Sequence, residues 1–302
     1  MKKIIVIITI LFCLIYLLIP PGIEGEVLEK KLTSNFNQNW LKTIISIEII
    51  EKDDERKTEK HNPTGTGFLI ETKNKHLLLT TAKHVIIDNN TGKVRDKLPY
   101  RLNDKIGNSI LITEEELENL LLGSWFLSET YDLACRFIVV SKTSDIATIS
   151  QESFLYAEDV QAGTQIFLLG FPLGIRSEKY AKPITRHGIV SRSEPNNLIV
   201  DVGFYPGNSG GPVIYVPVMK FGGGLNSFLL NEEKLVGVAT QYISYVDVAI
   251  SAQTGRNRIT FEENSGLCNV VPVNAINSLL ERDDLSTLDK KLIEIFKKLK
   301  IE

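Results

Sequence analysis

Gly207-Asn208-Ser209-Gly210-Gly211, followed by Pro212, places one serine among glycines and predicts a tight turn. A turn of this kind exposes the serine hydroxyl and frees the backbone N–H groups of Gly207 and Ser209 to point at one spot. Acyl-transfer chemistry uses a nucleophile together with donors that stabilise the oxyanion it generates. Because glycine-rich turns are common, the string indicates a nucleophile only if a histidine and a carboxylate lie in suitable settings upstream.

The histidine has one good candidate among His61, His76, His84 and His187. His84 follows an apolar run that ends in small and polar residues, 77–83, which predicts a buried strand and then a turn. Such a turn holds a general base rigidly and leaves it open to a substrate. We expect His61, in a charged loop, and His76, at a turn, to face solvent, and His187 to be a strand residue.

Two sites compete for the carboxylate that would orient the histidine: Asp132-Leu133-Ala134 and Asp145-Ile146-Ala147. Asp132 leads a long apolar run, 133–140, and therefore lies at the mouth of an expected strand. The stretch after Asp145 soon turns polar at Ser150. We favour Asp132 and keep Asp145 as the alternative.

Composition narrows the classes of function. The chain has 302 residues, 43% of them hydrophobic, which suffices for one large or two small cores. Its net charge of -3 includes no basic excess, so we expect no nucleic-acid partner. No spacing of His, Cys and Asp resembles a metal site, and we expect neither a metal nor another cofactor. Cys135 and Cys268 lie in apolar runs and are expected to be buried and free.

Short apolar runs separated by turns predict an all-β fold. They are expected to be strands at 44–50, 67–71, 77–80, 133–140, 165–169, 188–191, 198–202, 213–216, 235–240 and 269–273. This length fits two six-stranded antiparallel β-barrels, at 40–150 and 151–275, with the crossover near 150–161. The charged stretch 51–64 predicts a loop.

Helix signals are few. Thr113-Glu114-Glu115-Glu116 is a capping box that predicts a short helix to about Leu122. A second helix is expected over 274–281, and a third begins at Asp284 with one apolar face. The last two form a C-terminal helical tail, 276–302, which we expect to pack on the body, with the second barrel as its docking site.

The N-terminus differs from the rest. Met1-Lys2-Lys3 precedes an uncharged apolar run, 4–19, and Pro20-Pro21-Gly22 closes it. A basic start before a short apolar run is typical of a secretory signal, although the run also approaches the ~20 residues that span a bilayer. Residues 1–25 are therefore a signal peptide or an uncleaved membrane anchor. Either interpretation puts the body outside the cytoplasm, in the periplasm or secreted.

The candidate residues occur in the order His84, Asp132, Ser209, which is one of the known triad orders of serine hydrolases. Five further segments accompany the serine string in a matching order: 65–70, 81–85, 132–134, 170–174 and 235–238. With these segments, the chain from about 44 to 280 resembles a trypsin-like serine protease of the chymotrypsin fold. It is more similar to bacterial secreted and HtrA-like members than to digestive enzymes, although we expect no PDZ domain after the barrels.

The resemblance implies a serine endopeptidase acting on protein or peptide substrates. Ser209 would be the nucleophile, His84 the base and Asp132 its partner, with Gly207 and Ser209 forming the oxyanion hole. It also implies substrate contacts at Gly203, Thr240 and Tyr242, with the Thr240 hydroxyl supporting the aspartate.

The chain departs from that family's digestive members at three positions, and these differences lead to expectations about substrate specificity and activation. Gly203 stands six residues before the nucleophile, where trypsin has an aspartate, so a preference for Lys or Arg is not expected. Tyr242 replaces a glycine of the pocket wall, which favours small or medium apolar side chains. Asn208 stands where those enzymes have the aspartate that pairs with a freed N-terminus, so we expect no activation of that type.

Two alternatives belong to other classes. One is a catalytically silent binding protein of the same fold at the membrane. The other is an α/β-hydrolase esterase, since Gly207–Gly211 also fits a Gly-x-Ser-x-Gly elbow. The esterase fails because the histidine precedes the serine and strands do not alternate with helices. The oligomeric state stays open.

Overall fold

The computed structural model describes residues 36–53, 58–120, 122–177, 179–217 and 232–299. Residues 38–302 form one compact body, to which the description below refers. Its two halves are called the first and the second unit. The apolar run 4–19 lies outside the described residues. Among the helices in the described ranges, none has the length and apolarity needed to cross a membrane.

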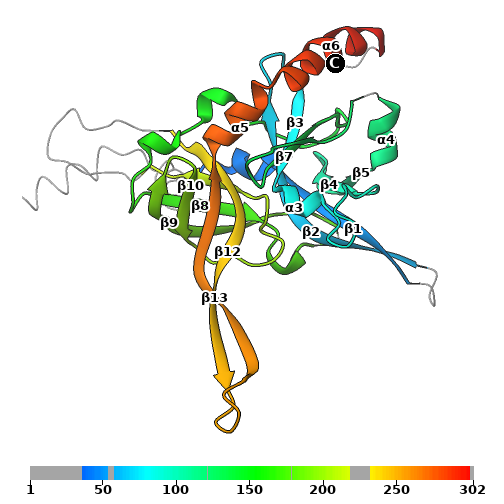
Figure 1. Cartoon of the computed structure of the whole chain (residues 1–302). Coiled ribbons are helices and arrows are strands. Elements are labelled where there is room, and N and C mark those ends of the chain that lie inside the picture. The colour runs from blue at the N-terminus through cyan, green and yellow to red at the C-terminus, as the bar shows by residue number, and fades with distance from the viewer. Residues whose placement is uncertain (1–35, 54–57, 121, 178, 218–231, 300–302) are drawn as a thin grey trace, which may run out of the picture. The chain divides into compact units, whose positions relative to one another are not determined.

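The first unit is a seven-stranded sheet in the order β5-β4-β1-β2-β3-β7-β6 (Figure 1). Neighbouring strands pair antiparallel, as between Gly67 of β2 and Thr81 of β3. The strands are β1 (Ile44–Asp53), β2 (Thr58–Glu71), β3 (Leu77–Thr81), β4 (Tyr100–Asn103), β5 (Ser109–Ile112), β6 (Phe126–Leu127) and β7 (Ala134–Ile138).

The second unit is a closed barrel in the order β10-β13-β12-β11-β8-β9. Its strands are β8 (Gln165–Gly170), β9 (Ile184–Glu194), β10 (Asn197–Asp201), β11 (Pro212–Tyr215), β12 (Lys234–Ile250) and β13 (Asn257–Pro272). Alternate residues of these strands fill the interior, so that Leu198 and Val200 are fully buried while Asp201 is exposed. The barrel interior is thus an apolar core.

The predicted chymotrypsin-like fold of two antiparallel β-units with C-terminal helices is confirmed. The first unit differs from the expected six-stranded barrel. It has seven strands, because the two-residue strand β6 adds to the edge of β7, and it is a sheet with β5 and β6 at its edges. The domain boundary expected at 150–151 remains a prediction.

The predicted loop at 51–64 is wrong. β1 and β2 form a hairpin whose register runs from Ile44 opposite Phe68 to Asp53 opposite Thr58. The polar composition of this stretch suggested a loop, but pairing satisfies the backbone N–H and C=O groups whatever side chains they carry. His61 therefore lies on a strand and is partly buried.

The β12–β13 pair also extends far beyond the runs expected from the sequence. The two strands stay paired out to Ile250 opposite Asn257, and the ribbon projects from the barrel in Figure 1. Along its outer part several apolar side chains are exposed, among them Ile250 and Phe261.

The three helices expected from the sequence are present as α4 (Glu114–Asn119), α5 (Val273–Leu280) and α6 (Asp283–Leu299). The structure adds the single helical turn α3 (Lys83–Ile86) and the short 3-10 turns η1 (Gln38–Thr43), η2 (Gln151–Ser153), η3 (Ala157–Asp159) and η4 (Pro172–Gly174). The capping box of α4 is present, with Thr113 and Glu116 bonded reciprocally. Cys135 and Cys268 are buried and free as expected, and burial raises the pKa of Cys268 to about 12.

The tail helix α6 contacts the first unit, contrary to the expected docking on the second barrel. Asp289 of α6 is buried and accepts a hydrogen bond from the Thr72 hydroxyl at 2.8 Å. Its carboxylate also lies 2.6 Å from Nδ1 of His76, and Phe296 packs edge-on against that ring. His76 is therefore buried, and the expectation that it faces solvent is wrong. Its polar partner is far along the chain and is not visible in local sequence.

Candidate active site

His84 lies in the single helical turn α3, which directly follows the buried strand β3. The turn begins after Ala82, whose backbone is extended, and the apolar side chains of Val85 and Ile86 anchor it in the core. The imidazole remains 46% exposed, so a substrate can reach it. A short turn anchored on both sides thus presents the histidine in a fixed position.

Asp132 holds this histidine through two contacts. Its Oδ2 lies 2.6 Å from Nδ1 of His84, and its Oδ1 accepts the His84 backbone N–H at 2.9 Å. Partial burial alone would raise the pKa of Asp132, but the hydrogen bonds and charge of His84 lower that pKa below its usual range. The carboxylate is therefore charged at neutral pH.

The alternative carboxylate, Asp145, lies elsewhere. It pairs with Lys42 at 2.8 Å, and its backbone N–H donates to Asn103. Of the two Asp-x-Ala sites, the structure brings only Asp132 to His84.

Ser209, the candidate nucleophile, sits between β10 and β11, in residues 202–211, of which 206–211 are called the nucleophile loop below. The backbone of this loop needs glycine. Gly207 and Gly210 have φ values of +93° and +85°, which other residues rarely adopt. A Cβ at Gly207 would also collide with the carbonyl oxygen of Phe171, and one at Gly210 with that of Thr66. The glycines therefore permit both the tight turn and its close approach to neighbouring backbone.

The backbone N–H groups of this loop divide into two sets. Those of Asn208, Gly210 and Gly211 donate to backbone carbonyls at 2.8–2.9 Å. Those of Gly207 and Ser209 have no acceptor among the described residues. Since backbone donors are normally satisfied, two unpartnered N–H groups beside a serine form a ready site for an oxyanion.

Thr66 of β2 connects the nucleophile loop to β3, the strand that leads to His84. Its backbone N–H donates to the Ser209 carbonyl at 2.8 Å, and its hydroxyl donates to the Gly207 carbonyl at 2.6 Å. The Thr81 hydroxyl donates in turn to the Thr66 carbonyl at 2.7 Å. Gly65, which precedes Thr66, lies between Val85 and Ser209. A Cβ at this position would collide with the Val85 side chain and lie 3.2 Å from the Ser209 carbonyl oxygen.

The Ser209 hydroxyl donates to the Thr240 carbonyl at 3.1 Å rather than to His84. A change of serine rotamer redirects such a hydroxyl, and catalytic hydrogen bonds often form only with substrate. The implied bond from the Thr240 hydroxyl to the aspartate is not observed. That hydroxyl donates to the Asn269 carbonyl at 3.2 Å, where the β12–β13 register shifts between Ala239 and Gln241.

The remaining predicted substrate contacts lie near this loop. Gly203 precedes it, and the guanidinium of Arg186 from β9 occupies the space in which a side chain at 203 would lie. Tyr242 follows Thr240 on β12, and its hydroxyl donates to Glu262 at 3.4 Å. Sequence reasoning missed Arg186, because no local motif indicates that its side chain reaches Gly203.

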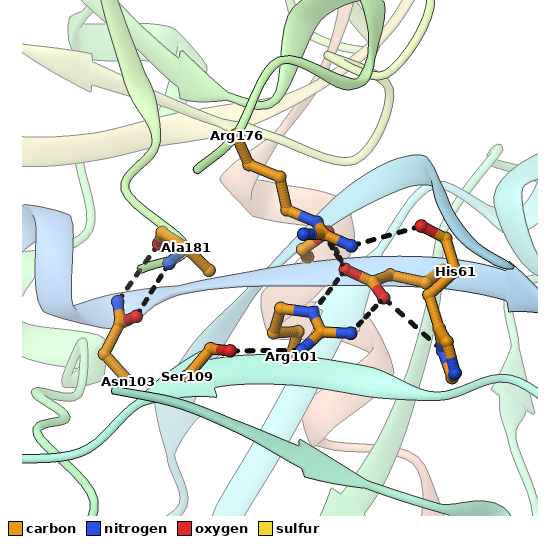
Figure 2. Close-up of polar contacts among 8 residues, drawn as sticks. His61, Arg101, Asn103, Ser109, Arg176 and Ala181 are labelled. Carbon is orange, nitrogen blue, oxygen red and sulfur yellow. Dashed lines mark hydrogen bonds and ion pairs between the residues drawn. The ribbon is translucent and has the colours of Figure 1, made fainter. Parts of the chain in front are cut away.

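A buried carboxylate joins the two units. The Glu48 side chain is fully buried, bonds Arg101 at 2.8 and 3.0 Å, and forms an ion pair with Arg176 at 2.8 Å. Figure 2 shows Arg101 and Arg176 approaching from opposite sides, with Arg176 also bonded to the His61 carbonyl. Arg176 follows η4, whose Leu173 N–H donates to the Pro206 carbonyl at 2.6 Å. Glu48 thus supports the segment that contacts the nucleophile loop.

Within the described ranges, no group of three His, Cys, Asp or Glu side chains could hold a metal ion.

Comparison with known families finds a match to the trypsin-like peptidase domain over residues 65–216. This span is half of the chain and includes His84, Asp132 and Ser209. Comparison with curated proteins found no match.

Proposed function

This chain belongs to the trypsin-like peptidase family, and from that premise we propose that it is a serine endopeptidase that cuts proteins or peptides through an acyl-enzyme. The observation that carries the proposal is the Ser209 loop. Between residues 207 and 211, the N–H groups of Gly207 and Ser209 are the two that lack an acceptor among the described residues, while the other three are bonded. A loop with only a structural role would have no reason to leave both donors unsatisfied.

In the proposed mechanism, the Ser209 hydroxyl attacks the substrate carbonyl while His84 accepts its proton. The Asp132 carboxylate at Nδ1 requires the proton on that nitrogen and leaves Nε2 as the base. The same carboxylate stabilises the imidazolium that forms. His84 then gives its proton to the leaving amine, and water releases the acyl group from Ser209 by the reverse sequence.

The oxyanion that forms during attack would be held by the N–H groups of Gly207 and Ser209. Each such donor contributes about 3 kcal/mol to transition-state stabilisation in a comparable protease. Because the glycine backbone fixes these donors before substrate arrives, no reorganisation is needed at the moment of reaction.

We also propose that the enzyme needs no activation by a freed N-terminus. Asn208 carries no charge, and it is 1% exposed with its side-chain Nδ2 lacking a hydrogen-bond partner. It offers no carboxylate for such an ion pair. The oxyanion-hole conformation is supported instead by Thr66, which bonds both Gly207 and Ser209.

The location proposed from residues 1–25 is outside the cytoplasm, with membrane association through 4–19 if this segment is retained. A silent binding protein of the same fold is the second candidate. The intact His84–Asp132 contact favours the enzyme, because a pure binding module has no need for it.

Labelling with a fluorophosphonate probe tests the proposal. We expect the wild-type protein to be labelled once, at Ser209, and to cleave casein, whereas the Ser209→Ala variant does neither while unfolding at a similar temperature. Ser251→Ala, at the turn after β12, serves as the matched serine control and should behave as wild type. A wild-type protein that folds but takes no label would instead identify the binding protein.

A further inference from the structure

Arg186 is an unpaired cation next to the nucleophile loop. It lies on β9 opposite Leu168 of β8 and is half-buried. Its Nε is buried without a hydrogen-bond partner, and no carboxylate pairs with its guanidinium in the described parts of the chain. Since a guanidinium cannot lose its proton in a protein, the charge stays and lacks a protein counter-ion.

Two residues fix where this charge lies. The guanidinium stacks on Tyr205, with its central carbon 4.9 Å from the ring centroid. A Cβ at Gly203 would collide with Nη1 of Arg186, so the guanidinium fills the space that a side chain at 203 would occupy. Arg186 thereby places a positive charge beside Gly203, a residue that has no side chain of its own.

Residues 202–205, two of which contact the guanidinium of Arg186, are bonded to the barrel and to the nucleophile loop. Val202 and Phe204 are buried in the barrel core, while Gly203 and Tyr205 contact the guanidinium of Arg186. The Phe204 carbonyl accepts a hydrogen bond from Asn264 of β13, and the Tyr205 carbonyl accepts one from Asn208. Two hydrogen bonds thus connect the residues that contact Arg186 to β13 and to the loop that carries Ser209.

We propose that Arg186 receives an acidic side chain of the substrate, and that the enzyme cuts after Glu or Asp. The inference rests on the proposed peptidase function and names its substrate class. Gly203 is a predicted substrate contact, and Tyr205 is 38% exposed, so the stacked guanidinium borders a surface that ligands can reach. A carboxylate is the group that a guanidinium binds best, through short, charge-assisted bonds.

Other substrate classes fit this position less well. A Lys or Arg side chain would bring a second cation beside Arg186 with no carboxylate between them. An apolar side chain, which Tyr242 alone would favour, would cover the guanidinium and leave its charge desolvated without a partner. Arg186 therefore changes the expectation drawn from Gly203 and Tyr242.

Matched peptides that differ only in Glu, Gln, Leu or Lys before the cleaved bond test the inference. For the wild type we expect kcat/KM to be highest for Glu. In Arg186→Gln the Glu-to-Gln ratio should fall roughly tenfold or more, the loss of one hydrogen bond to a charged group. Arg192→Gln is the control, because Arg192 lies on the same strand but is exposed and paired with Glu194. Its Glu-to-Gln ratio should match the wild type.

A second variant guards against misfolding of Arg186→Gln. Gly203→Asp keeps Arg186 but places a carboxylate beside the flexible end of its side chain, so the preference for Glu should again be lost. The inference is overturned if wild type reacts with the fluorophosphonate probe yet cleaves after Gln as well as after Glu, or if both variants keep the wild-type ratio. A protein that takes no probe and cuts no peptide contradicts the proposed function instead.

Discussion

The carboxylate of Asp132 contacts His84 at two points, the ring Nδ1 at 2.6 Å and the backbone N–H at 2.9 Å. The first contact fixes the tautomer of the imidazole. The second fixes the start of α3, the turn that carries it. One side chain thus controls both the protonation pattern and the position of the proposed base.

Asp132→Asn should preserve the fold and lower kcat by about 10⁴-fold, because the amide no longer selects the tautomer that leaves Nε2 free. Steady-state kinetics on a cleaved peptide measures this loss. Asp145→Asn is the matched control: it removes an ion pair with Lys42 and should leave kcat unchanged. Equal losses in the two variants would contradict the assignment of Asp132.

The pH dependence of the same pair has a definite sign. The pKa of Asp132 lies below its ordinary value of 3.8 in the folded protein, so the folded state favours the charged carboxylate. The stabilisation is therefore present above pH 3.8 and lost as pH falls through the lower folded pKa. NMR titration of the Asp132 carboxyl carbon should show a midpoint below 3.8. A midpoint above that value would reverse the sign.

Gly207→Ala should lower kcat by roughly 10²- to 10³-fold with a smaller change in KM, since it displaces one oxyanion donor. The cause is steric: the residue has φ +93° and its new Cβ would collide with the Phe171 carbonyl. Gly255→Ala is a close control, because Gly255 also has a positive φ, +65°, but has nothing within 4 Å of its Cβ position. Kinetics on one peptide compares them. If Gly207→Ala behaves like Gly255→Ala, those donors do not act on the oxyanion.

Much of the fold and of the candidate site could be predicted from the order of the motifs in the sequence. The strand before His84, the glycines around Ser209 and the capping box at Thr113 are local signals, and each element lies where its pattern indicates. Choosing Asp132 over Asp145 also depended on a local feature, the longer apolar run that follows Asp132. Local propensity is a sound guide where burial and turn chemistry agree.

Features that depend on long-range contacts could not be predicted. The charged stretch after Ile50 was expected to be a loop, since its composition carries no sign that it pairs with residues of β2. Arg186 and Gly203 are separated by β10, and nothing in either segment indicates that one side chain fills the space of the other. His76 finds its carboxylate in the tail helix, 213 residues away. In each case tertiary packing supplied the partner.

Glu48→Gln should lower the free energy of unfolding by about 3–5 kcal/mol, because it leaves Arg101 and Arg176 beside a buried neutral amide. Denaturation with urea measures the change. Glu194→Gln is the control: its pair with Arg192 is exposed, at 58% and 52%, and should contribute only about 0–1 kcal/mol.

Glu48→Gln should also reduce kcat at temperatures where the protein stays folded. The reason is that Glu48 restrains Arg176, and the preceding turn η4 donates from Leu173 to the carbonyl of Pro206, next to Gly207. A looser η4 would leave the oxyanion donors less well fixed, and a small misplacement of such groups costs much of their effect. If Glu48→Gln loses stability but retains full kcat, Glu48 joins the two units without positioning the nucleophile loop.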